Sequence, residues 1–148
     1  MPTSTRFVVA VHILTAIAVG DGKPMRSEDL AYSANTSPVV IRGLLSRLGH
    51  AGLTRSQLGA GGGALLARSA RKIRLVDVYE AVEDTELFSL HRTPPCESCV
   101  VGGNILQAMQ PVLSRAREAL ESELAKVTIF DIASEVARLG EFSIPLVR

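Results

Sequence analysis

Residues 59–63 read Gly-Ala-Gly-Gly-Gly, a run that cannot sustain a helix because glycine loses more backbone freedom on folding than any other residue. Short strand-like segments, 53–56 and 64–67, lie on either side of this run. Two such segments joined by a glycine-rich turn are typical of a β-hairpin. The sequence therefore predicts one slim hairpin wing near the middle of the chain.

Three helices are predicted before the hairpin. Residues 6–19 are almost entirely apolar, which indicates a buried helix too short to cross a membrane. Residues 27–33 begin with a serine that suits an N-cap, followed by two acids in the first turn. Residues 38–49 follow the N-cap Ser37 and begin with Pro38, whose missing N–H costs nothing there. The apolar stripe of this third helix consists of Val40, Ile41, Leu44, Leu45 and Leu48.

The second half of the chain is predicted to contain a loop and a long helix. A fourth helix spans 76–82, and residues 85–103 form a loop that carries both cysteines. Thr128 and Asp131 predict a capped last helix, and Pro111 a kink or late start in the long one. Apolar residues spaced by three and four form a seam for a partner helix: Leu106, Met109, Leu113, Ala116, Leu120, Leu124 and Val127. The expected domains are a winged helix-turn-helix domain at 1–83, a cysteine loop at 84–103, dimerisation helices at 104–139 and a tail at 140–148.

Composition and charge narrow the class of protein. With 148 residues, 47% of them apolar, 4% aromatic and none Trp, the chain suits one core of closely packed helices. The net charge of +1 hides an asymmetry, because residues 1–75 hold ten Lys or Arg against three acids, and residues 76–148 hold six against twelve. The halves therefore carry about +7 and −6, which indicates a polyanionic partner for the first half only.

Two helices joined by a short turn and followed by a hairpin are typical of a winged helix-turn-helix domain. A major groove about 12 Å wide admits one helix, and a slim wing can follow the neighbouring backbone. The helix over 38–49 is the expected recognition helix, with Arg42 as its main contact; the alternative is an ordinary solvated helix face. The expected DNA contacts are Ser27, Ser37, Pro38, Val39, Val40, Arg42, Ser46, Arg47, Arg55, Gly61 and Gly62.

Other classes of function gain less support. The glycine run is not followed by Lys-Ser or Lys-Thr and does not open onto a helix, so it lacks the features of a phosphate-binding loop, and no catalytic constellation stands out. We expect a protein that is not an enzyme. No signal-peptide pattern or membrane-spanning run is present, so a cytoplasmic location without a membrane partner is expected.

The motifs together resemble the Rrf-two (BadM-type) family of bacterial transcription regulators, and particularly its YwnA-like subgroup. The matching runs are residues 27–31, 35–42, 51–53, the glycine-rich wing, 73–83 and 99–102. The resemblance extends from about residue 6 to residue 132. It implies a homodimer that binds a palindromic double-stranded operator, usually as a repressor, with its long helix packed against the partner.

Cys96 and Cys99 do not decide which signal such a regulator would respond to. Regulators of this family that hold an iron-sulfur cluster use three cysteines in the loop before the dimer helix, whereas this chain has two. The conceivable additional ligands for a cluster are His91, Glu97 and His12. A structural zinc site needs four ligands, of which one Cys-x-x-Cys pair supplies only two. We therefore expect no cofactor and no metal. The two thiols are candidate redox sensors, or else inert. A protein-interaction module and a small-molecule-responsive regulator without redox function are the alternative functions.

Overall fold

The computed structural model describes residues 4–84 and 86–144. The helices and strands follow the order expected for a mostly helical chain with one hairpin wing, which confirms that prediction. In chain order they are α1 Arg6–Val19, α2 Ser27–Ala34, α3 Pro38–His50, β1 Thr54–Gln57, β2 Gly63–Leu66, the short 3-10 helix η1 Ala70–Lys72, α4 Leu75–Val82, α5 Val100–Leu124 and α6 Ile129–Leu139.

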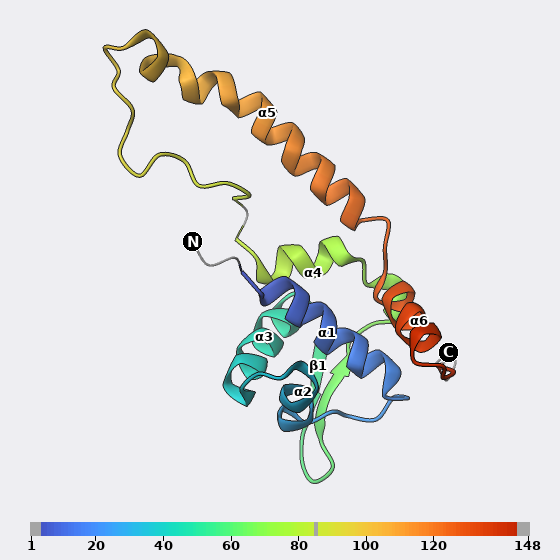
Figure 1. The fold of residues 1–148 in the computed structure, drawn as a ribbon. Helices are drawn as coiled ribbons and strands as arrows, with labels where there is room; N and C mark the ends of the chain where they lie inside the picture. The colour runs from blue at the N-terminus through green and yellow to red at the C-terminus, as the bar shows by residue number, and fades with distance from the viewer. Residues whose placement is uncertain (1–3, 85, 145–148) are drawn as a thin grey trace.

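Helix α1 lies at the centre of the folded body, with α2, α3, α4, α6 and β2 around it (Figure 1). Ile13 and Leu14 are fully buried there. The expectation that α1 is buried on all sides is wrong, because Val8 is 68% exposed and His12 lies at the surface, where its Nε2 contacts the Ser33 hydroxyl at 2.8 Å. Neighbouring elements cover only part of the circumference of α1.

The wing is an antiparallel hairpin in which Thr54 pairs with Leu66 and Gln57 with Gly63. Both strands are displaced by one residue from their predicted positions, because Leu53 belongs to the core and accepts a hydrogen bond from the Ala67 amide at 3.0 Å. The base of β2 also pairs with the segment before α2 through Met25, whose carbonyl accepts from Ala64 N at 2.7 Å. The wing is therefore anchored to the helix-turn-helix.

The starts of α4 and α6 are tied to each other by backbone pairing. Leu75 N donates to Val127 O at 2.8 Å, and Ile129 N donates to Ile73 O at the same distance. Thr128 and Asp131 form a capping box at the start of α6, which confirms the predicted cap. The segment that follows the long helix is thus fixed to the folded body.

Helix α5 begins at Val100 and not near residue 104, so the predicted boundary between loop and helix is four residues too late. Gly102 and Gly103, which were included in the predicted loop, lie inside the first turn, where they allow the cysteine loop to approach closely. A Cβ on Gly102 would lie 2.1 Å from Cys96 O. The helix continues through Pro111 as one element, so Pro111 is not a late start.

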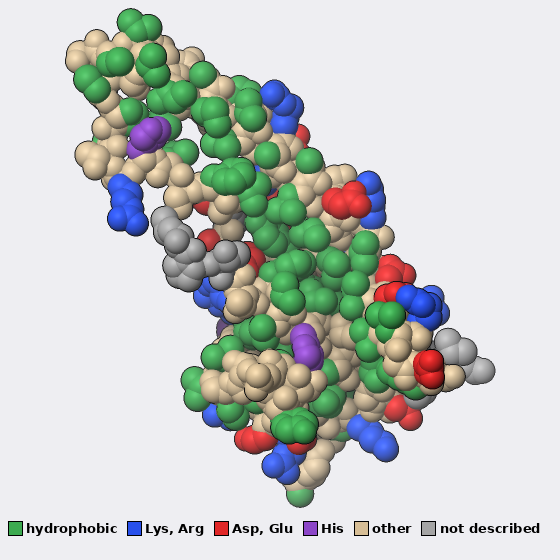
Figure 2. All heavy atoms as spheres, viewed as in Figure 1, with side chains coloured by type: hydrophobic (Ala, Val, Ile, Leu, Met, Phe, Trp, Pro, Cys, Tyr) green, Lys and Arg blue, Asp and Glu red, His purple; other side chains and the backbone are tan. Residues whose placement is uncertain are grey.

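Most of α5 extends away from the body, and α4 is its main contact among the helices and strands (Figure 1). None of its residues is fully buried. Leu106, Met109 and Val112 are 37%, 40% and 48% exposed, and Figure 2 shows hydrophobic side chains along this helix. Leu106 and Met109 of the predicted seam are thus exposed in the single chain, whereas Leu113, Ala116, Leu120, Leu124 and Val127 are half-buried.

Candidate nucleic-acid interface

The turn between α2 and α3 sets the position of the recognition helix. Asn35 ends α2 in the left-handed conformation, with φ of 51°, which asparagine tolerates. The Ser37 hydroxyl then accepts from Val40 N at 3.3 Å, and Pro38 stands at the start of α3, as the sequence predicted. Ser27 differs from its expectation: it is the first residue of α2 and not the cap, because Arg26 holds the extended N-cap position.

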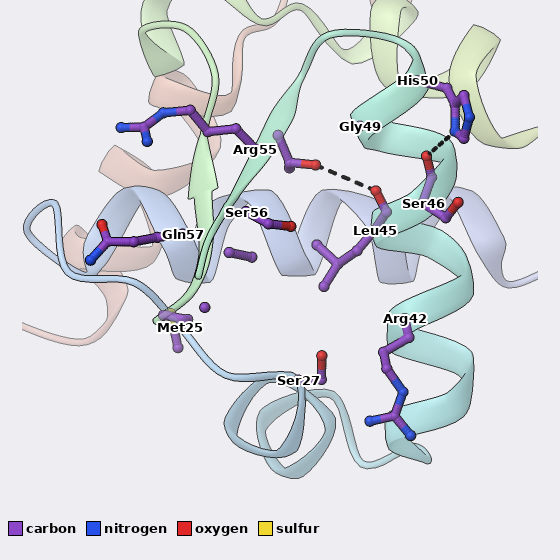
Figure 3. A pocket seen from close by; sticks show the side chains of 13 residues that line it. Met25, Ser27, Arg42, Leu45, Ser46, Gly49, His50, Arg55, Ser56 and Gln57 are labelled. Carbon is purple, nitrogen blue, oxygen red and sulfur yellow. Dashed lines mark hydrogen bonds between the residues drawn. The ribbon is translucent and has the colours of Figure 1, made fainter. Parts of the chain in front are cut away.

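A cleft of about 660 Å³ lies between α3 and the wing (Figure 3). Helix α3 forms one wall, β1 forms the other, and the segment leading into α2 closes the lower side in this view. The lining side chains are mostly polar or small, without an acid among them. They belong to Met25, Ser27, Arg42, Leu45, Ser46, Gly49, His50, Thr54, Arg55, Ser56, Gln57, Gly63 and Ala64.

Several predicted contact residues do line this cleft. Arg42 and Ser46 come from α3 and Ser27 from the first turn of α2. The Arg42 guanidinium lies 3.7 Å from Glu28 Oε1, and both side chains are 56% exposed, so this ion pair is weak and easily replaced. The cleft therefore offers a cation that is available to a phosphate or to a base edge.

The first turn of α3 contributes exposed apolar side chains. Val39 is 71% exposed and Val40 46%, although Val40 was expected to belong to the apolar stripe. Val40 lies at the edge of the buried stripe, since the next residue, Ile41, is fully buried. Together with Ser37 and Pro38, these residues present the end of α3 that enters a major groove in helix-turn-helix proteins.

Two predicted contacts have other neighbours. Arg47 Nη1 donates to Val82 O at 3.3 Å, which engages this side chain with the end of α4. Arg55 projects away from α3 in Figure 3, on the strand face that it shares with its pairing partner Leu65. Their roles in DNA binding stay predictions.

The turn of the wing explains why the sequence needs glycine there. A Cβ on Gly62 would lie 2.2 Å from Gln57 O, and Gly61 has φ of +73°. Leu58, 90% exposed, lies beside these two predicted contacts. The turn is therefore narrow enough to follow a nucleic-acid backbone.

The sequence interpretation missed part of the cleft wall. Ser56 and Gln57 line the cleft, as does His50, whose Nδ1 lies 2.7 Å from Ser46 O within α3. The alternation of β1 carried the signal for Ser56, because Thr54 and Ser56 share the strand face opposite to Arg55. Gln57 and His50 gave no such signal, since their positions depend on where the hairpin and the helix end.

Both cysteines are exposed and free. The Ser98 hydroxyl, 3.1 Å from Cys96 Sγ, lowers the pKa of Cys96, with help from the Cys99 amide. The amides of Gly102 and Val101, at the start of α5, lower the pKa of Cys99. These shifts favour the thiolate, which is the reactive form of cysteine.

An iron-sulfur cluster does not fit the donor set. A cluster of the common types is held by four ligands, mainly cysteine thiolates. Within residues 4–84 and 86–144 no three His, Cys, Asp or Glu side chains gather as a metal site would require.

In the same ranges no helix is both long and apolar enough to cross a membrane.

A helix-turn-helix followed by a wing, with a basic cleft between them, defines the class of winged-helix DNA-binding proteins. The family model described as "Rrf2: Iron-dependent Transcriptional regulator" matches residues 3–135. The chain therefore belongs to the Rrf2 family, the Rrf-two family that its motifs resemble. This is a family of DNA-binding transcription regulators and not of enzymes.

Individual relatives agree with this assignment. The chain is 35% identical over 134 residues to YwnA of Bacillus subtilis (strain 168), a candidate HTH-type transcriptional regulator. The aligned region covers 90% of this chain and 98% of YwnA. A crystal structure of a candidate DNA-binding protein is 34% identical with a TM-score of 0.70, covering 86% of this chain and 98% of that one. The oxidised form of Staphylococcus aureus CymR is 25% identical with a TM-score of 0.67, covering 90% and 96%.

Proposed function

We propose that the chain acts as a homodimer, binds a palindromic operator through α3 and the wing, and represses transcription until its loop thiols are oxidised. The observation that carries this proposal is the cleft in which Arg42 and Ser46 of α3 face the wing. A helix in the major groove, with a wing on the adjacent backbone, meets DNA in this arrangement. Because operators are chromosomal, the proposed place of action is the bacterial cytoplasm.

The proposed contact set divides by role. Arg42 and Ser46 read base edges, while Ser27, Ser37, Pro38 and the wing glycines contact the phosphate backbone. Val39 and Val40 are the apolar groups available to a thymine methyl. Charge supports the assignment, since the net charge of residues 1–75 is about +7.

The dimer is supported by the open apolar face of α5. Leu113, Ala116 and Leu120 are half-buried, and they continue the exposed row begun by Leu106 and Met109. A groove of about 410 Å³ between the cysteine loop and α5 adds apolar surface to this row. Two copies of such a helix, packed on each other, place two recognition helices on one operator.

The redox response is supported by the position of the thiols. Cys99 is the N-cap of α5, and the carbonyl of Cys96 lies against Gly102 in its first turn. Oxidation there alters the start of the dimer helix, and hence the placement of the two recognition helices, which must meet half-sites about 34 to 36 Å apart. An oxidised form is recorded for the related CymR of Staphylococcus aureus.

The test starts with selection of an operator from random duplex DNA, followed by anisotropy with the full site and a half-site. We expect tight, salt-dependent binding of the palindrome, and loss of a transcript when the site overlaps a promoter. Binding of the palindrome no tighter than random duplex contradicts specific recognition. Peroxide is expected to lower affinity in the wild type and to have no effect on the Cys96→Ser, Cys99→Ser double variant. Equal responses of the two proteins to peroxide show that Cys96 and Cys99 are not the redox sensors.

A further inference from the structure

A second cavity, of about 310 Å³, lies on the opposite side of the wing from the DNA cleft. It is bounded by the end of α1, by β2, by η1 with the residues before it, and by α6. Its volume corresponds to about ten water molecules at their liquid density, so it can hold a compound of about ten heavy atoms. Apart from Arg55, none of the expected DNA contacts lines this cavity, and neither thiol does; we call it the rear pocket.

The rear pocket has an apolar floor. Ile17, Leu65 and Ala133 are 3%, 7% and 1% exposed and come from three different elements. Phe130 adds an aromatic ring from the first turn of α6. The half-buried side chains around this floor, Leu66, Ala70 and Phe130, supply the apolar area that leaves water when the hydrocarbon part of a ligand binds.

The rim of the pocket is cationic. Arg55, Arg68 and Arg71 line it, and none of them has an ion-pair partner among the described residues. Arg71 is held with its guanidinium carbon 3.6 Å from the centre of the Phe130 ring, which leaves its N–H groups at the ring edge for an acceptor. The positive charge of Arg68 helps to lower the pKa of Asp77, but the Asp77 carboxylate is already paired with Arg74 at 3.0 Å.

An apolar floor beside unpaired guanidinium groups matches one ligand chemistry. We propose that the rear pocket binds a small amphipathic carboxylate, whose hydrocarbon part lies on Ile17, Leu65 and Phe130 and whose anionic end is held by Arg68 and Arg71. Guanidinium binds carboxylate through paired, charge-assisted hydrogen bonds, and the phenyl or alkyl part supplies the rest of the affinity.

The pocket shares its walls with both functional parts of the molecule. Leu65 lines the rear pocket and Thr54, Ser56 and Ala64 line the DNA cleft, while Arg55, which pairs with Leu65 across the hairpin, lines both. Phe130 and Ala133 belong to α6, which follows the dimer helix. A bound ligand that prefers one position of the wing or of α6 therefore changes operator affinity by its differential affinity for the two states. This coupling, unlike binding itself, rests on the proposed function.

Binding is tested directly on the DNA-free protein by calorimetry. The probes are acetate, hexanoate, benzoate and hydrocinnamate, with benzamide and hydrocinnamamide as uncharged analogues. We expect saturable binding of hydrocinnamate, none of acetate, and roughly tenfold weaker binding of the amides. Arg68→Gln and Arg71→Gln are expected to weaken hydrocinnamate binding by a similar factor. Lys72→Gln, which removes the same charge from η1 outside the pocket, is expected to leave binding unchanged.

The outcomes separate the possibilities. Equal binding of acid and amide, no saturable binding of any probe, or equal losses in Arg68→Gln and Lys72→Gln each overturn the proposal. Anisotropy with the selected operator, with and without hydrocinnamate, then tests the coupling. If the protein binds the carboxylate but no operator, the proposed function fails while the rear pocket stands.

Discussion

Arg42 and Arg47 lie five residues apart on α3, yet their guanidinium groups have different neighbours. Arg42 lines the cleft, with Glu28 as a distant ion-pair partner, whereas Arg47 donates to Val82 O at 3.3 Å. We expect Arg42→Ala to weaken operator binding by about 1 to 3 kcal/mol and to reduce its salt dependence. Arg47→Ala is expected to cost stability by about 1 kcal/mol and to leave the affinity nearly intact.

Anisotropy at several salt concentrations measures the first effect, and urea unfolding measures the second. Each variant is the control for the other, because both remove one arginine from the same helix. An unchanged affinity of Arg42→Ala at every salt concentration removes this residue from the contact set. A large loss of affinity in a stable Arg47→Ala protein shows that its bond to Val82 opens on binding DNA.

The thiols offer a pH-dependent prediction. Hydrogen bonds from Ser98 and from backbone amides lower the pKa of Cys96, and amides of α5 lower the pKa of Cys99. The pH midpoint of each thiol's reaction is therefore expected to lie below the usual value near 8.5. Reaction slows as pH falls through the lowered pKa, since the thiolate is protonated there. The rate of attack on an aromatic disulfide reagent, measured against pH in the two single-cysteine proteins, gives each midpoint.

Ser98→Ala separates the two thiols. It removes the hydroxyl that stabilises the Cys96 thiolate, so the midpoint of Cys96 is expected to rise while that of Cys99 stays in place. Urea-unfolded protein supplies the reference value for both. Midpoints in the folded protein equal to those in urea contradict the contribution of the fold.

At the scale of the elements, the wing depends on one close approach. A Cβ on Gly63 would lie 2.5 Å from Met25 O, so Gly63→Ala must displace β2 from the segment before α2. We expect a loss of about 1 to 3 kcal/mol of unfolding free energy, together with weaker operator binding. Gly43→Ala is the matched change, because its Cβ meets nothing within 4 Å on an exposed turn of α3. Thermal unfolding is expected to show a gain of up to about 1 kcal/mol there.

The same elements show what the sequence could reveal. Local signals sufficed for Ser37 with Pro38, for the capping box of Thr128 and for the glycine-rich turn, since each is decided within a few residues. The start of α5 was misplaced because residues 85–103 show no steady periodicity, whereas Gly102 and Gly103 belong to its first turn and allow the carbonyls of Cys96 and Glu97 to approach. The hydrogen bond from Arg47 to Val82 and the far wall of the cleft depend on tertiary packing, which periodicity does not encode.

For the molecule as a whole, the apolar row of α5 predicts association between two copies of the chain. No residue of α5 is fully buried in the single chain, so we expect a dimer in which Leu113 and Leu120 pack across the two helices. Leu113→Asp buries an unpaired charge in that interface, at a cost of about 3 kcal/mol or more, and is expected to give monomers. The opposite face of α5 holds the control. Ser122 is exposed and lies about two and a half turns beyond Leu113, so Ser122→Asp introduces the same charge on the other side of the helix.

Sedimentation over a range of concentrations measures the association, and circular dichroism reports whether each variant stays helical. The wild type and Ser122→Asp are expected to sediment as dimers at micromolar concentration, and Leu113→Asp as a folded or partly unfolded monomer. Because each half-site of a palindrome binds one recognition helix, the monomer is also expected to bind the full operator no more tightly than a half-site. A wild type that stays monomeric and folded, or a Leu113→Asp protein that stays dimeric, rules out association through this row of α5.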